Sequence, residues 1–131
     1  MKGGSLQGIG MEYAQLIDVA AEFDFIPDRK TAEAIVKAVL GILASSLTEP
    51  LARTLTDFLP QPLDYERLRG HQAKPLAITG DLYTKAVSSQ FHLSADEARR
   101  VIIAILNLAK DRVGSKELGE IIHTLGFEVA P

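Results

Sequence analysis

The fold is decided by the stretch AEAIVKAVLGIL at residues 32–43, because its apolar pattern returns sixty-six positions later in ARRVIIAILNLA at residues 98–109. In both stretches the apolar side chains recur every three or four residues, which is the spacing of an amphipathic helix. At full length the pattern pairs Ala32, Ile35, Val36, Val39, Leu40, Leu43 and Leu47 with Ala98, Val101, Ile102, Ile105, Leu106, Ala109 and Val113. The sequence therefore predicts two matching helices.

Both predicted helices carry a second apolar stripe. The added positions are Ala34, Ala38 and Ile42 in one helix, and Ile103, Ala104 and Leu108 in the other. A helix that is apolar nearly all round is expected at the centre of a fold. Because Gly41 aligns with Asn107, we expect the two helices to cross here about a pseudo-twofold axis, with the glycine permitting close approach. A second subunit that covers the same stripes is the alternative.

The helix boundaries are marked by capping residues. Asp28 and Ser94 precede the two central helices, and Ser94 forms a capping box with Glu97. Thr48 and Ser115 are the predicted caps of the helices that follow.

A further helix precedes each central helix, over residues 11–23 and around residues 82–91. We therefore predict an all-α fold, a six-helix bundle built from two three-helix repeats related by a pseudo-twofold axis.

These boundaries define the expected organisation of the chain. Residues 11–131 form a single helical domain with repeat 1 at about 11–60, a connector at 61–77 and repeat 2 at about 78–127. Leu63, Tyr65 and Leu68 give the connector one extra helical turn. Glycine-rich residues 1–10 are interpreted as a flexible leader, either native or an expression remnant, before a natural start at Met11.

Composition limits the classes of function. The chain has 131 residues, of which 47% are hydrophobic and 24% charged, as in ordinary globular domains. A net charge of −3 disfavours nucleic acid as a partner. The absence of cysteine fits a cytoplasmic location. No apolar run approaches the roughly 20 residues of a membrane-spanning helix, so no membrane association is expected.

The sequence offers little for catalysis. The three histidines, His71, His92 and His123, do not pair at helical spacing, and no glycine motif for phosphate is present. The serines lack the GxSxG context of a nucleophile. We predict no catalytic residue, no cofactor and no metal site, and we interpret the protein as non-enzymatic.

The connector carries the candidate interaction surface. Its aromatic and basic residues are suited to bind an anion or an acidic partner, and they are Tyr65, Arg67, Arg69, His71 and Lys74. The alternative is that these residues belong to a solvated loop without a binding role. The leading hypothesis is a protein-interaction or scaffold module that binds a protein partner or itself.

A small-ligand-binding protein or a cofactor-free enzyme is the alternative function. Helical repeats commonly leave clefts between them. The candidate lining of a pocket between the repeats is aromatic and consists of Tyr13, Phe25, Tyr83 and Phe91.

The repeated unit resembles a known family. A short helix and a capped turn lead into AEAIVKAVLGIL or EARRVIIAILNLAKDRV, and a third helix ends in FLP within the distinctive LPQPL at residues 59–63. This order, from Met11 to Phe127, is similar to that of the uncharacterised bacterial proteins grouped as domain of unknown function 2267 (DUF2267). The resemblance implies a helical protein of two such units, and it brings no established reaction, cofactor or catalytic residue.

Overall fold

The computed structural model describes residues 13–61, 63–69 and 75–127, and this part of the chain contains seven α-helices and no β-strand. The predicted all-α fold class is therefore confirmed. The helices are α1 (Tyr13–Ala21), α2 (Arg29–Ser46), α3 (Glu49–Asp57), α4 (Tyr65–Arg69), α5 (Gly80–Phe91), α6 (Ala95–Val113) and α7 (Lys116–Leu125). The leader predicted at residues 1–10 lies outside the described residues.

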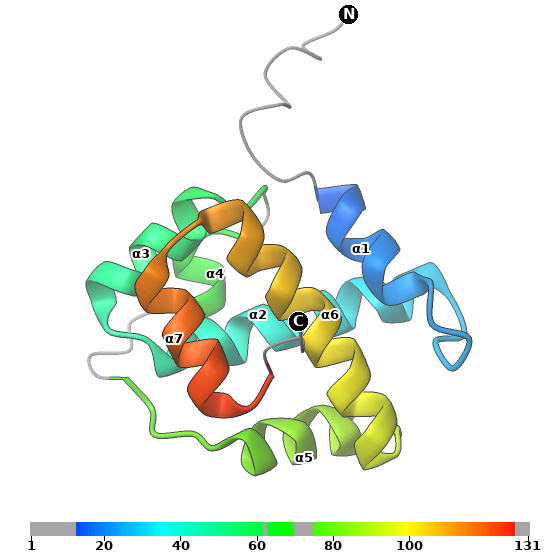
Figure 1. Ribbon diagram of the computed structural model, residues 1–131. Helices are drawn as coiled ribbons and strands as arrows, with labels where there is room; N and C mark the ends of the chain where they lie inside the picture. Colours follow the sequence, from blue (N-terminus) through cyan, green and yellow to red (C-terminus); the bar gives the residue numbers. More distant parts are fainter. Residues whose placement is uncertain (1–12, 62, 70–74, 128–131) are drawn as a thin grey trace, which may run out of the picture.

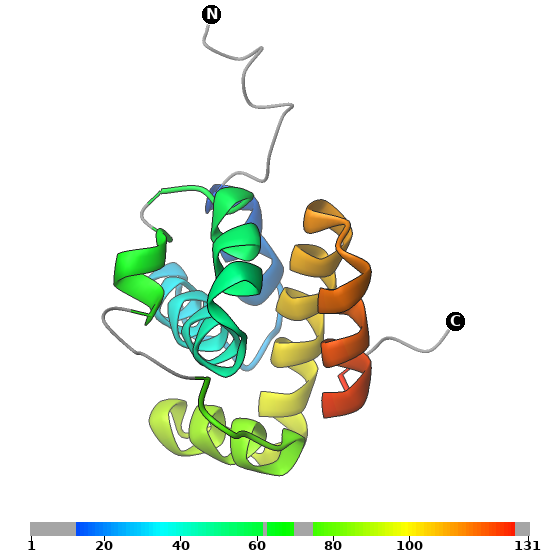
Figure 2. The ribbon, with the colours of Figure 1, turned by 90° about the vertical axis from the view of Figure 1, so that its left-hand side faces the viewer.

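Helices α2 and α6 lie at the centre, as their apolar stretches predict. Helix α2 packs against α1, α3, α4, α5 and α6, and helix α6 packs against α1, α2, α3, α5 and α7. Every position of the paired apolar pattern is buried, none being more than 8% exposed. The two ribbon views show the remaining helices arranged around this pair, with α7 beside α6 (Figures 1 and 2).

Three predicted caps are formed by side chains. The Asp28 carboxylate accepts a hydrogen bond of 2.7 Å from the Thr31 amide at the start of α2. At the start of α6, the Ser94 hydroxyl accepts from the Glu97 amide while the Glu97 carboxylate accepts from the Ser94 amide. At the start of α7, the Ser115 hydroxyl accepts a single capping hydrogen bond from the Leu118 amide. These contacts satisfy amide groups that the first turn of a helix leaves without partners.

The predicted cap at Thr48 is wrong in one respect. Thr48 occupies the N-cap position of α3, but its side chain accepts no capping hydrogen bond from the described backbone. Pro50 stands in the first turn and has no amide hydrogen, so this helix has one donor fewer to satisfy than the others.

The role predicted for Gly41 is also wrong. A Cβ atom built on Gly41 would approach the carbonyl oxygen of Leu68 in α4 at 3.9 Å, and no atom of α6 lies nearer. At the aligned position in α6, the side-chain amide of Asn107 donates to the carbonyl of Phe127 at 2.8 Å. The two positions therefore face α4 and the C-terminal segment, and neither marks the crossing of α2 with α6.

Helix α4 makes the helix count seven where the sequence predicts six. It is the extra turn expected in the connector, and it packs against α2 and α3. Leu63, just before it, is 1% exposed and belongs to the core. Part of the connector is thus built into the fold.

The C-terminal end of the described chain closes the core over α5. Phe127 is fully buried, and its ring meets the ring of Tyr83 edge to face with centroids 5.3 Å apart. The Tyr83 hydroxyl donates in turn to the carbonyl of Val39. These contacts connect the C-terminal segment through α5 to α2.

Across residues 13–61, 63–69 and 75–127, no helix is long and apolar enough to cross a membrane.

Candidate interaction groove

The predicted interaction residues of the connector occupy different environments. Tyr65 is half-buried, and the guanidinium carbon of Arg53 lies 4.0 Å from the centroid of its ring. Arg67 is exposed, and its amide donates to the Asp64 carboxylate at 2.9 Å. The predictions for His71 and Lys74 lie outside the described residues. Tyr65 and Arg67 therefore remain candidates, whereas Arg69 does not.

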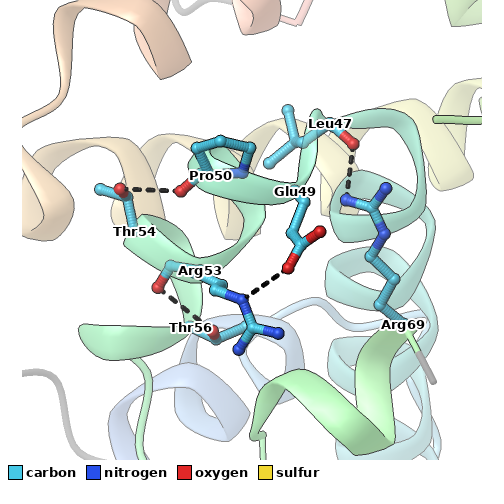
Figure 3. A network of polar contacts seen from close by, with 7 residues as sticks. All are labelled: Leu47, Glu49, Pro50, Arg53, Thr54, Thr56 and Arg69. Atoms are coloured by element: carbon cyan, nitrogen blue, oxygen red, sulfur yellow. Dashed lines mark hydrogen bonds and ion pairs between the residues drawn. The ribbon is translucent and has the colours of Figure 1, made fainter. Parts of the chain in front are cut away.

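Arg69 was expected on the surface and is only 6% exposed. Its Nη1 donates to the carbonyl of Leu47 at 2.6 Å, so the guanidinium group lies at the end of α2 (Figure 3). A cation there is favoured by the partial negative charge of a helix C-terminus. Nε and Nη2 are buried without a hydrogen-bond partner in the described structure. Arg69 joins α4 to α2 and is removed from the predicted surface.

The predicted aromatic pocket residues are also distributed. Tyr83 is fully buried in the core, and Tyr13 donates its hydroxyl to the Glu33 carboxylate at 2.7 Å. Phe25 stacks on the ring of Phe23 with centroids 5.1 Å apart. Phe91 is half-buried against the core. None of the four predicted residues lines the hollows described next, so a pocket formed by them stays a prediction.

The surface is hollowed where the end of the connector meets α7. We call this hollow of about 590 Å³ the α7 groove. Its lining is mainly apolar with two carboxylates and consists of Ser46, Pro75, Leu76, Ala77, Ile78, Glu117, Glu120, Ile121, Thr124 and Leu125. Segments distant in sequence thus form one surface.

Residues 75–78 line one side of the α7 groove, and two of them also border a second hollow. That hollow has about 350 Å³ and lies between α2 and the same segment, with Leu76 and Ile78 lining both. The Leu76 amide donates to the carbonyl of Ser45 at 2.8 Å, which fixes the segment to α2. The Leu76 side chain is nevertheless 59% exposed. A large apolar side chain is therefore held in place at the surface.

The comparisons with known proteins give a family. A family model described as "Uncharacterized conserved protein (DUF2267)" matches residues 13–131, which is most of the chain. This chain belongs to the DUF2267 family. No curated protein and no solved structure gives a match.

A third hollow on this DUF2267 chain is charged. It has about 540 Å³ and lies between the end of α6, which contributes Lys110 and Asp111, and α7, which contributes Lys116, Glu120 and His123. Within the described ranges, no group of three or more histidine, aspartate or glutamate side chains is placed to hold a metal ion. The lining of this hollow carries side chains of both charges, whereas the charged side chains of the α7 groove are carboxylates.

The sequence interpretation of this DUF2267 chain missed the α7 groove. The spacing of Leu118, Ile121, Ile122 and Leu125 predicts one buried stripe on the last helix, but Ile121 and Leu125 are only half-buried. Apolar Leu76 and Ile78 directly after Pro75 were a signal that the connector does not end as a solvated loop. Their position beside α7 depends on long-range packing, which helical spacing does not contain.

Proposed function

We propose that this protein is a non-enzymatic protein-interaction module that binds its partner at the α7 groove. The observation that carries the proposal is Leu76, which is 59% exposed and held by its amide between two hollows. Exposed apolar surface rimmed by polar side chains is typical of protein interaction sites. Covering Leu76 with a partner would remove its exposed apolar surface from water, which favours association.

The proposal includes the origin of the scaffold. Helices α1–α3 and α5–α7 correspond to two three-helix repeats, supported by the equal burial of their paired apolar positions and by caps at matching places. Helix α4 and residues 75–77 belong to the connector and have no counterpart in this pairing. The groove is thus placed where the duplication is asymmetric.

We further propose a bacterial cytoplasmic protein whose partners do not include nucleic acid. The lack of cysteine supports a reducing compartment. The net charge of −3 supports a partner other than a polyanion.

Leu76→Ser tests the binding site, and Leu82→Ser is its matched control. Leu82 is 55% exposed on α5 and lies outside the lining of the α7 groove. The immobilised full-length protein is expected to capture a stoichiometric partner from native lysate, or to associate with itself in light scattering. We expect Leu76→Ser to weaken that association about tenfold or more and Leu82→Ser to leave it unchanged.

Two results would contradict this function. The first is a monomer in light scattering together with no stoichiometric partner in the capture experiment. The second is a partner whose affinity falls equally in both leucine variants, because the α7 groove would then have no special part in binding.

A small-ligand-binding protein is the second candidate, and the size of the α7 groove favours it. A volume of about 590 Å³ falls within the usual range of ligand pockets. A thermal-shift screen of metabolites distinguishes the two functions. A stabilisation of several degrees that is lost in Leu76→Ser would favour the ligand.

A further inference from the structure

We infer that the α7 groove accepts a basic amphipathic helix from a partner protein, which presents apolar side chains to the groove and lysine or arginine side chains to its edge. This inference rests on the proposed function, because it names the class of partner for the same surface. It is carried by the charge and the shape of the groove.

The charged groups that line the groove are carboxylates. Glu117 and Glu120 lie three residues apart on α7, and both are exposed. Neither forms an ion pair with another residue in the described part of the chain, and no lysine or arginine from that part lines the groove. A partner with cations at matching positions is therefore favoured over an acidic one.

The two carboxylates do not contribute equally. Glu120 lines both the α7 groove and the charged hollow that contains Lys110 and Lys116. Glu117 lines the α7 groove and not the charged hollow. Glu117 stands in the first turn of α7, where a negative charge also stabilises the helix. A test must therefore separate binding from the stability of α7.

The apolar lining favours a helix as the occupant. Ile121 and Leu125 are one helical turn apart along α7 and line the groove together with Leu76 and Ile78. A helix laid along such a groove inserts side chains spaced three and four residues apart. Strand addition would instead need a sheet edge, and residues 13–61, 63–69 and 75–127 contain no strand; an extended proline-rich peptide would need an aromatic-lined groove, and no aromatic side chain from these residues lines this one.

A second copy of this chain is a less favourable occupant. It brings a net charge of −3 toward a rim that is itself negative. Like charges brought together at an interface oppose association.

The probe is a fluorescent model peptide of ~18 residues, about five helical turns, with leucine on one face and lysine on the other. A second peptide carries glutamate in place of lysine. Fluorescence anisotropy with the full-length protein is expected to give about tenfold weaker binding for the acidic peptide. Leu76→Ser should weaken the basic peptide by a similar factor.

The charge is tested by the double variant Glu117→Gln and Glu120→Gln. We expect about three- to tenfold weaker binding of the basic peptide and a smaller dependence on salt. The matched control is Glu22→Gln with Asp24→Asn, which removes the same charge from exposed positions outside the groove. The control should bind like the wild type. Thermal unfolding of both double variants shows whether α7 remains folded.

Three outcomes would overturn the inference. They are equal affinity for the two peptides, an equal effect of the two double variants, and a wild-type dimer that Leu76→Ser dissociates. The proposed function would survive the first two outcomes if Leu76→Ser still abolished capture of the natural partner. It would fail separately if that capture did not depend on Leu76.

Discussion

Two tyrosine hydroxyl groups reach α2 from other helices. Tyr13 on α1 donates to Glu33, and Tyr83 on α5 donates to the carbonyl of Val39. Burial raises the pKa of both phenols above the ordinary value of about 10. The hydrogen bond from Tyr13 lowers the pKa of the Glu33 carboxyl. The two phenols therefore limit the stability of the fold at alkaline pH, and the Glu33 carboxyl limits it at acidic pH.

The sign of each contribution follows from linkage. A phenol whose pKa is raised by folding stabilises the fold fully below its unfolded pKa, and the contribution is lost as the pH rises through the folded pKa. The Glu33 carboxyl, whose pKa is lowered, stabilises the fold above its unfolded pKa and loses that contribution in acid.

Tyr83→Phe tests the alkaline limit. Above about pH 10 we expect the free energy of unfolding of the wild type to fall, because the buried phenol of Tyr83 stays protonated while the unfolded one ionises. In this range the free energy of unfolding of Tyr83→Phe should fall less steeply than that of the wild type, by up to about 1.4 kcal/mol per pH unit. Urea denaturation from about pH 8 to about pH 11 measures both profiles. Parallel profiles would show that Tyr83 is not the group responsible, since lysine ionisation affects both proteins alike.

At the scale of helices, the local signals in the sequence predicted the elements well. The bounds of α2 and α6 follow from an apolar stripe and from the caps Asp28 and Ser94, all of which act within a few residues. The roles of Gly41 and Arg69 were mispredicted because each faces a segment more than twenty residues away. Spacing along one helix says which face is apolar, but not which helix covers it.

Alanine substitutions at two helical glycines are expected to change the free energy of unfolding in opposite directions. A Cβ atom on Gly80, at the start of α5, would lie 2.2 Å from the carbonyl oxygen of Leu125 in α7. Gly80→Ala therefore requires backbone movement, and we expect a loss of about 1–3 kcal/mol. Gly41→Ala meets only an ordinary contact at 3.9 Å and should gain about 0.5–1 kcal/mol from its better helix propensity.

Urea denaturation of both glycine variants measures the difference. A Gly41→Ala variant less stable than the wild type would support the sequence prediction that α2 and α6 approach closely at this residue. A Gly80→Ala variant as stable as the wild type would show that α5 and α7 do not approach closely.

At the scale of the whole molecule, the candidate site could be predicted only in part. The connector was predicted to carry the interaction surface, and its residues 75–77 line the α7 groove, whereas Tyr65, Arg67 and Arg69 do not. The groove also needs Ile121 and Leu125, which the sequence assigns to a buried stripe. A surface assembled from distant segments follows from the packing of the whole fold, so no single window of sequence contains it.

The packing of the whole fold depends on its C-terminal segment, and Phe127→Ala tests this dependence. Phe127 is fully buried against Tyr83, Asn107 donates to its carbonyl, and Arg99 donates to the carbonyl of Gly126. Truncating a buried phenylalanine costs about 3–5 kcal/mol, which is a large share of the roughly 5–15 kcal/mol that stabilises a domain.

Phe58 provides the matched control for this truncation, because it is 38% exposed at the end of α3. Phe58→Ala should cost only about 1 kcal/mol, since much of its ring already contacts water. Urea denaturation at neutral pH compares the two variants with the wild type. Equal losses in the free energy of unfolding would mean that the C-terminal segment contributes no more to stability than a partly exposed side chain does. A loss at least about twice as large for Phe127→Ala would mean that burial of this ring against Tyr83 contributes to the stability of the whole fold.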